Sequence, residues 1–221
     1  MDKHTVINML SQSAISYTNR IPVCGKYENV FVESIRTDTE CFVRKARDHV
    51  TIVFRGTDSQ KNWINNLCFC KKTIPDREQN KRLKVHKGFL EGYESVRQKI
   101  RNLIPEEVCK IKVAGHSLGA ALAILCALDL KSSFKNADLE VYLFGCPRVG
   151  NKEFAKAYNK YVFKTLRIVN GNDIVTKLPP VFLGYKHVGI LIHTGASPKP
   201  AIISFSDHNP QSYFSSLWKQ L

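Results

Sequence analysis

Apolar positions along the 221-residue chain switch between helical and strand-like spacing. Residues 4–17 repeat apolar side chains at the spacing of an amphipathic helix, and so do residues 89–103. Three short β-like runs with turn residues between them lie at 30–35, 41–45 and 50–54. Because these runs follow one another so closely, they predict an antiparallel entry to a sheet.

The middle of the chain alternates strands with helices. A strand is predicted over 109–114, a buried helix over 120–128 and another strand over 139–144. Asn151 can cap a further helix, and residues 165–169 predict a strand that a polar loop follows. Residues 187–193 and 201–205 suggest a hairpin, and a last helix follows Pro210. This alternation predicts an α/β fold with a sheet covered on both faces.

Composition limits the classes of protein that the chain can belong to. Hydrophobic residues make up 43% and charged residues 24%, which is ordinary for a globular protein, and no repeat or linker divides residues 1–221. We therefore predict one domain. The first ten residues hold no long apolar run, so we expect no secretory leader there. The longest apolar run (118–128) is too short to span a bilayer, and the seven cysteines form no C-x-x-C pair. We expect reduced thiols in an intracellular, cytoplasmic protein that is at most peripheral to membranes. The scattered histidines predict no metal site.

The formal net charge of +14 favours contact with polyanions. The densest basic stretch, residues 71–87, holds seven bases against Asp76 and Glu78, a net charge of +5. The chain contains no recognised nucleic-acid motif, so an anionic membrane surface is the expected partner and nucleic acid is not. The alternative is that this stretch is only a solvated loop.

Residues 115–119 read Gly-His-Ser-Leu-Gly, a G-x-S-x-G motif between a predicted strand and a predicted helix. In this context the motif predicts a nucleophile elbow, a sharp turn that exposes the hydroxyl of Ser117. The glycines are needed because the strand and the helix approach closely at the turn. The N-terminus of the helix lies beneath the serine, where its N–H groups suit a developing oxyanion.

A serine nucleophile needs a base, and the base needs an orienting carboxylate. Asp173 follows the strand 165–169, where a sheet places its active-site residues; the alternative is an aspartate that only caps a turn. Chain order and position leave three histidines as bases, namely His187, His193 and His208. His208 lies in a loop after the last predicted strand and is preferred, and His187 is the second choice.

Several further motifs occur in a fixed order along most of the chain. They are Phe54-Arg-Gly-Thr57 with Asn62-Trp63, Val85-His-Lys-Gly-Phe89, Gly145-Cys-Pro-Arg-Val-Gly-Asn151, Arg167–Val175 and Leu178-Pro-Pro180. With the elbow they resemble the class 3 lipase family from about Val50 to Tyr213. The resemblance implies an α/β-hydrolase fold, with a mostly parallel central sheet, antiparallel edge strands and helices on both faces.

The resemblance also assigns roles by position. It implies Ser117 as nucleophile, Asp173 as acid and His208 as base, with Thr57 and Leu118 forming the oxyanion hole and no cofactor. Thr57 could offer both its N–H and its hydroxyl. The family often has Asp-His-x-x-Tyr, whereas here Asn209-Pro-Gln-Ser precedes Tyr213, an insertion that bears on the register of the base.

Residues 59–67 place Trp63, Ile64 and Leu67 on one face of a short predicted helix. One reading is a lid that opens at a lipid surface, and the other is a helix packed permanently on the body of the protein. The chain as a whole predicts a serine acylhydrolase that cleaves carboxylic esters of lipids, as a triacylglycerol lipase does. The alternatives are a phospholipase A1 acting on anionic phospholipid, or a non-catalytic polyanion-binding protein on a decayed hydrolase fold.

Overall fold

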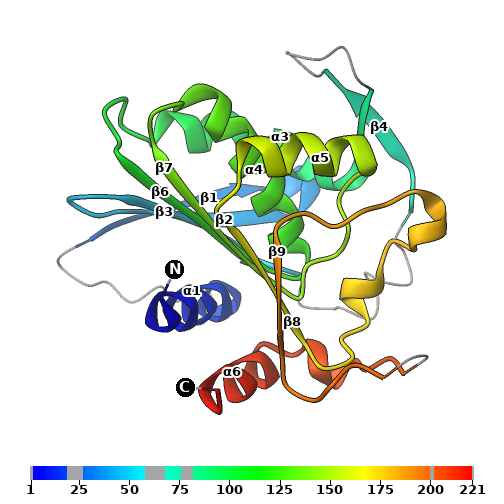
Figure 1. Cartoon of the computed structure of the whole chain (residues 1–221). Coiled ribbons are helices and arrows are strands. Elements are labelled where there is room, and N and C mark those ends of the chain that lie inside the picture. The colour runs from blue at the N-terminus through cyan, green and yellow to red at the C-terminus, as the bar shows by residue number, and fades with distance from the viewer. Residues whose placement is uncertain (1, 19–26, 58–67, 76–81, 200–201, 221) are drawn as a thin grey trace.

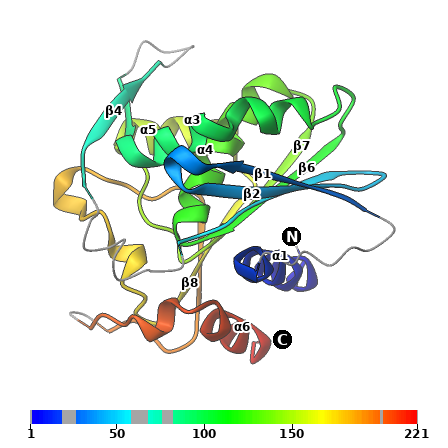
Figure 2. The same cartoon turned by 180° about the vertical axis from the view of Figure 1, so that it is seen from behind.

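A seven-stranded sheet forms the centre of the molecule, and helices cover both of its faces (Figures 1 and 2). The computed structural model describes residues 2–18, 27–57, 68–75, 82–199 and 202–220. The strand order is β1-β2-β3-β6-β7-β8-β9. This arrangement confirms the predicted α/β architecture.

The first three strands are antiparallel and the rest of the sheet is parallel. β1 (Glu28–Ser34), β2 (Thr39–Lys45) and β3 (Val50–Phe54) form the antiparallel edge that the sequence predicts. β3 then pairs in parallel with β6, and the parallel part continues through β6 (Lys110–His116), β7 (Asp138–Phe144), β8 (Thr165–Asn170) and β9 (Ile190–Thr194). The register aligns Phe54 with Gly115 and His116 with Phe144. The carboxyl ends of β3, β6 and β7 therefore meet at one edge.

Each face of the sheet is covered by a separate group of helices. α3 (Lys87–Asn102), α4 (Leu118–Ser133) and α5 (Lys152–Tyr161) cover one face, and α1 (Lys3–Ile15) with α6 (Pro210–Trp218) covers the other (Figures 1 and 2). Burial on both faces of the sheet explains why the sequence of β7 is almost continuously apolar. Val141 and Leu143 belong to the core under α4, whereas Tyr142 and Phe144 belong to the core under α1 and α6.

Short 3₁₀ helices complete the chain. They are η1 (Ser16–Thr18), η2 (Ile35–Thr37), η3 (Val175–Lys177), η4 (Val181–Leu183) and η5 (Ser206–His208). Asn151 caps α5 as predicted, because its side chain accepts a hydrogen bond from the Phe154 N–H. Among the described residues, we find no helix with the length and apolarity to cross a bilayer, and no group of three side chains suited to a metal ion.

Two local predictions differ from the structure. β9 pairs in parallel with β8 and not in a hairpin with the residues after it. Ser204 instead forms a single parallel bridge with Asp173, so the chain returns to the acid loop. The basic stretch also contains a hairpin that the sequence did not predict, made of β4 (Lys71–Ile74) and β5 (Leu83–His86). Neither β4 nor β5 exceeds four residues, so the pattern of each is too short to recognise.

Candidate active site

Ser117 lies at the turn between β6 and α4, as the nucleophile-elbow prediction requires. Its backbone is left-handed and strained, with φ 59° and ψ −128°. Close packing explains the flanking glycines, because a Cβ on Gly115 would lie 2.4 Å from the backbone of Gly119. A Cβ on Gly119 would in turn lie 2.4 Å from the carbonyl oxygen of Phe54. The turn therefore accepts no larger side chain at either position.

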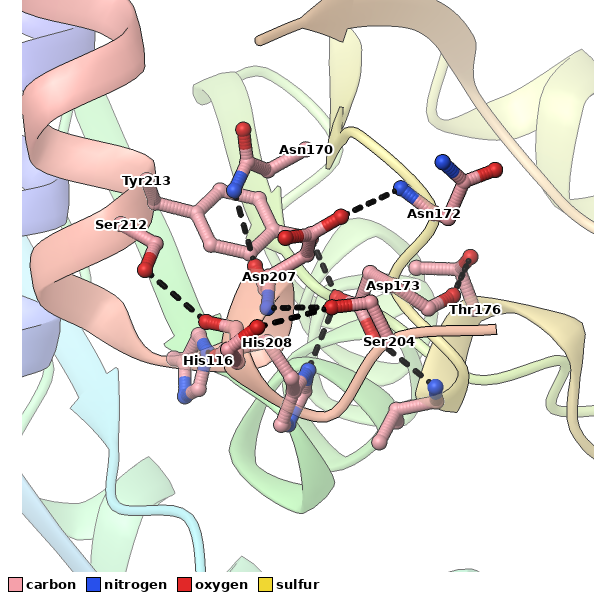
Figure 3. A network of polar contacts seen from close by, with 12 residues as sticks. His116, Asn170, Asn172, Asp173, Thr176, Ser204, Asp207, His208, Ser212 and Tyr213 are labelled. Carbon is pink, nitrogen blue, oxygen red and sulfur yellow. Dashed lines mark hydrogen bonds and ion pairs between the residues drawn. The ribbon is translucent and has the colours of Figure 1, made fainter. Parts of the chain in front are cut away.

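The acid and the base lie side by side. The imidazole Nδ1 of His208, in η5, is 2.8 Å from Oδ2 of Asp173, and both side chains are buried (Figure 3). Oδ1 of Asp173 accepts the Val175 N–H at 2.8 Å. Because an ionised carboxylate only accepts hydrogen bonds, His208 donates from Nδ1, and the lone pair of Nε2 is left available as a base.

Two buried polar atoms at the site have no hydrogen-bond partner among the residues that the structure describes. They are Oγ of Ser117 and Nε2 of His208. Buried polar groups are nearly always paired, so an unpaired hydroxyl and an unpaired imidazole nitrogen in one site need an explanation. A hydroxyl that must lose its proton and a nitrogen that must accept it are the two groups that a reacting ester would engage.

Tyr213, in α6, also holds the acid in place. Its hydroxyl donates to Oδ2 of Asp173 at 2.5 Å, the same oxygen that His208 contacts (Figure 3). Burial and the neighbouring carboxylate raise the pKa of Tyr213 well above its ordinary value, so the phenol stays a donor. The sequence predicted Tyr213 as an apolar position of the last helix, and matched it to the tyrosine of the family's Asp-His-x-x-Tyr motif, but gave its hydroxyl no role. The four residues between His208 and Tyr213 form the cap and first turn of α6, which brings the phenol to the acid.

His116 holds the backbone of the base. Its Nε2 is 2.8 Å from the carbonyl oxygen of His208, and its Nδ1 is 2.9 Å from the hydroxyl of Tyr17. Because a carbonyl only accepts, His116 donates from Nε2 and accepts the Tyr17 hydroxyl at Nδ1. Burial, with a smaller contribution from His208, lowers the pKa of His116 well below its ordinary value, so this ring is neutral. The sequence excluded His116 as the base, and the structure gives it a positioning contact instead.

The loop that contains the base is fixed to the acid loop by a second acidic residue. Oδ2 of Asp207 accepts the Asn172 N–H at 2.8 Å, and the Asp207 carbonyl accepts the side-chain amide of Asn170 at 2.9 Å (Figure 3). These bonds place His208 at the carboxyl end of β8, next to Asp173. Gly145, with φ +57°, lies beneath the pair, since a Cβ there would be 2.8 Å from the imidazole.

The predicted oxyanion residues lie beside the elbow. Leu118 is the first residue of α4, directly after Ser117. Thr57 is half-buried and follows Gly56, whose added Cβ would lie 2.8 Å from the His116 carbonyl oxygen. The loop after β3 therefore passes close to the elbow. The proposed lid residues Trp63, Ile64 and Leu67 lie outside the described residues.

The other candidate bases are engaged elsewhere. Nε2 of His187 lies 2.8 Å from the carbonyl oxygen of Thr176. Burial and the nearby guanidinium groups of Arg167 and Arg148 lower the pKa of His187 to about 3. Nε2 of His193 lies 3.1 Å from the Gly171 carbonyl oxygen. Of the three histidines, only His208 lies against Asp173.

An elbow serine on a mostly parallel sheet, followed by an acid and a histidine in that chain order, defines an α/β-hydrolase. Comparison with known proteins identifies the family within this class. The model of the lipase (class 3) family matches residues 51–183, and the chain belongs to that family.

Individual relatives agree with this assignment. Phospholipase A(1) DAD1 of Arabidopsis thaliana is 38% identical over 165 residues, which are 66% of this chain and 37% of that protein. A lipase of Rhizomucor miehei is 38% identical over 162 residues, 69% of this chain and 44% of the relative. A solved triacylglycerol lipase, whose catalytic centre is described as a serine protease triad, superposes with a TM-score of 0.73 at 32% identity. That superposition covers 86% of this chain and 78% of the other. The chain thus spans about two fifths of the length of the two curated relatives.

Proposed function

We propose that this protein is a serine acylhydrolase that cleaves carboxylic esters of lipids. The observation that carries the proposal is the pair of unpaired buried atoms, Ser117 Oγ and His208 Nε2. His208 Nε2 lies at the end of a hydrogen-bonded series that runs from Tyr213 through Asp173 to His208. The Ser117 N–H donates to the carbonyl oxygen of Phe144, the residue before the Gly145 that packs against the imidazole. A protein that had only kept the fold would have no need for an unpaired base beside an oriented carboxylate.

The reaction follows from the geometry. His208 Nε2 takes the proton of Ser117 as Oγ attacks the ester carbonyl, and the carbonyl oxygen becomes an oxyanion. The N–H groups of Leu118 and Thr57 stabilise that oxyanion. His208 then gives the proton to the leaving alcohol, which leaves an acyl-serine. Water attacks the acyl group in the same way, and the fatty acid and free Ser117 are released. Asp173 stabilises the imidazolium in both half-reactions.

The chain segment that connects Asp173 to His208 supports the proposal of a lipid substrate. Residues 174–206 contain three lysines and no aspartate or glutamate. Nine of the fourteen exposed large hydrophobic side chains among the described residues also lie there. We call this segment the apolar rim, and its exposed members are Val181, Phe182, Leu183, Ile190, Leu191, Ile192, Ile202, Ile203 and Phe205. Phe182 is 87% exposed, which is unfavourable in water unless another apolar phase covers it.

Two lysines donate hydrogen bonds to the backbone of the apolar rim. Nζ of Lys71 donates to the carbonyl oxygen of Leu183 and lies 4.3 Å from the centre of the Tyr185 ring. Nζ of Lys177 donates to the carbonyl oxygen of Ile202. The apolar rim therefore combines exposed apolar side chains with positively charged lysines, and residues 174–206 contain no acid that would neutralise those lysines. Apolar insertion and electrostatic attraction would act together at an anionic lipid surface.

Hydrolysis and binding assays test the two parts separately. Ser117→Ala should abolish hydrolysis of p-nitrophenyl butyrate and of emulsified triacylglycerol. Phe182→Ser should keep the soluble activity but lower activity on vesicles of mixed zwitterionic and anionic phospholipid. Phe163→Ser is the matched control, because Phe163 is 66% exposed but precedes β8, at the amino ends of the parallel strands and not at the carboxyl ends where the triad lies. If Phe182→Ser and Phe163→Ser act equally on vesicles, the rim does not dock on lipid.

A further inference from the structure

A cavity lies away from the triad, between the β4–β5 hairpin and the outer sides of α3, α4 and α5. Its volume is about 730 Å³. Both views show these elements together on one face of the sheet, opposite α1 and α6 (Figures 1 and 2). We call this cavity the helix-face groove. The mechanism proposed above does not use it.

The floor of the helix-face groove is apolar. It is formed by side chains from the hairpin and from all three helices, namely Leu83, Leu90, Leu125, Leu128, Ala157 and Tyr161. Leu83, Leu90 and Leu125 are buried, and the other three are partly exposed to the groove. Its volume falls within the range of about 300–1,000 Å³ that is typical of small-molecule pockets. An apolar floor of this size favours an apolar ligand.

One side of the groove is cationic. The carboxylate of Asp129 forms ion pairs with two arginines, because Arg97 lies 2.5 Å from it and Arg101 lies 3.0 Å from it. The hydroxyl of Tyr93 also donates to Asp129 at 2.7 Å. These contacts leave one positive charge in excess around Asp129, and Arg97 and Asp129 themselves line the groove.

Two further lysines lie on the same side of the groove, at the end of α4 and just beyond it. Nζ of Lys131 donates to the carbonyl oxygens of Lys135 and Ala137, which fixes its charge in place. Lys135 lines the groove and is exposed. Glu94, the other acid of the lining, lies 3.8 Å from Lys72. Among the residues that the structure describes, the acids of the lining are therefore matched by bases, and the charges of Lys131 and Lys135 remain available to an anion.

We propose that the helix-face groove binds a fatty acid, with the carboxylate at Lys131 and Lys135 and the acyl chain over the leucine floor. The charge complementarity selects an anionic amphiphile over a neutral lipid, whose head would leave the two lysines without a counter-charge. The source of the ligand rests on the proposed function, since lipid ester hydrolysis releases such an acid. The binding itself does not depend on catalysis.

The test measures binding of dodecanoate, below its micellar concentration, by calorimetry. Ser117 is first blocked with an alkylphosphonate, whose alkyl chain takes the place of the acyl group that Ser117 would carry. We expect one equivalent of dodecanoate to bind the blocked protein, and dodecanol to bind at least about fivefold more weakly. Leu128→Trp and Ala157→Leu, which fill the groove, should each abolish binding while the melting temperature stays near that of wild type.

Charge reversal provides the matched comparison. Lys135→Glu should weaken dodecanoate binding at least about fivefold, and raised salt should reduce this difference. Lys156→Glu is the control, because Lys156 is exposed on α5, carries the same charge and does not line the groove. Loss of binding on blocking Ser117 would place the acid in the active site and overturn the proposal. Wild-type binding by both groove-filling variants would overturn it as well. Failure of the proposed function is seen separately, as esterase activity that survives Ser117→Ala.

Discussion

Replacing Asp173 with asparagine should leave His208 in place but hold it in a tautomer that cannot act as a base. The two carboxylate oxygens have different partners, because Oδ1 accepts the Val175 N–H whereas Oδ2 faces His208 and Tyr213. An amide NH₂ group cannot take the place of Oδ1, since it would point at another N–H. The NH₂ group must therefore take the place of Oδ2 and donate to His208 Nδ1. His208 then carries its proton on Nε2 and cannot accept the proton of Ser117.

The expected loss in kcat is about 10⁴-fold, the size found when a triad histidine is held in the wrong tautomer. In barrier height this is about 5 kcal/mol. The assay is the steady-state hydrolysis of a soluble p-nitrophenyl ester at neutral pH. Asp207→Asn is the matched control, because Asp207 belongs to the same network but binds the Asn172 N–H and not the imidazole. If Asp173→Asn keeps activity within tenfold of wild type while remaining folded, the orientation argument fails.

Three further predictions follow from the buried groups. His208→Ala should reduce esterase activity as far as Ser117→Ala does, whereas His187→Ala should keep a substantial fraction; the reverse ranking would make His187 the base. Burial lowers the pKa of His187 to about 3 and that of His86 to about 4, so both are neutral when folded and bind protons on unfolding. The melting temperature should therefore fall as pH is lowered from about 6.5 towards 4, and a constant value would contradict the burial argument. Burial raises the pKa of the Cys41, Cys126 and Cys146 thiols, so a thiol reagent should label the exposed Cys68, Cys70 and Cys109 first in the native protein, and mass spectrometry should find no disulfide. Equal labelling of all six of these thiols would contradict the burial argument. A disulfide would count against the expected reducing, intracellular location.

The sequence predicted those features that depend on local pattern. The elbow is local, because the glycines, the strand before them and the apolar helix after them lie within about twenty residues of Ser117. Asp173 was also within reach, since a loop directly after a parallel strand lies at the functional edge of the sheet.

Contacts between distant segments could not be read from the sequence. Tyr213 reaches Asp173 across 40 positions, and Tyr17 reaches His116 across 99. β9 was expected to form a hairpin because its sequence fits either a hairpin or a parallel edge strand, and only its packing against β8 decides between them. A buried tyrosine that needs a partner for its hydroxyl was the available signal for Tyr213, but the sequence could not say which partner it takes.

The central claim is that Ser117 is the activated nucleophile of an acylhydrolase. The most direct measurement is the reaction of the native protein with a fluorophosphonate, followed by peptide mass spectrometry. We predict a single adduct, on Ser117, that forms at one equivalent together with complete loss of esterase activity, and no adduct in His208→Ala on the same time scale. An adduct on another serine, or full esterase activity in the protein labelled at Ser117, would contradict the account.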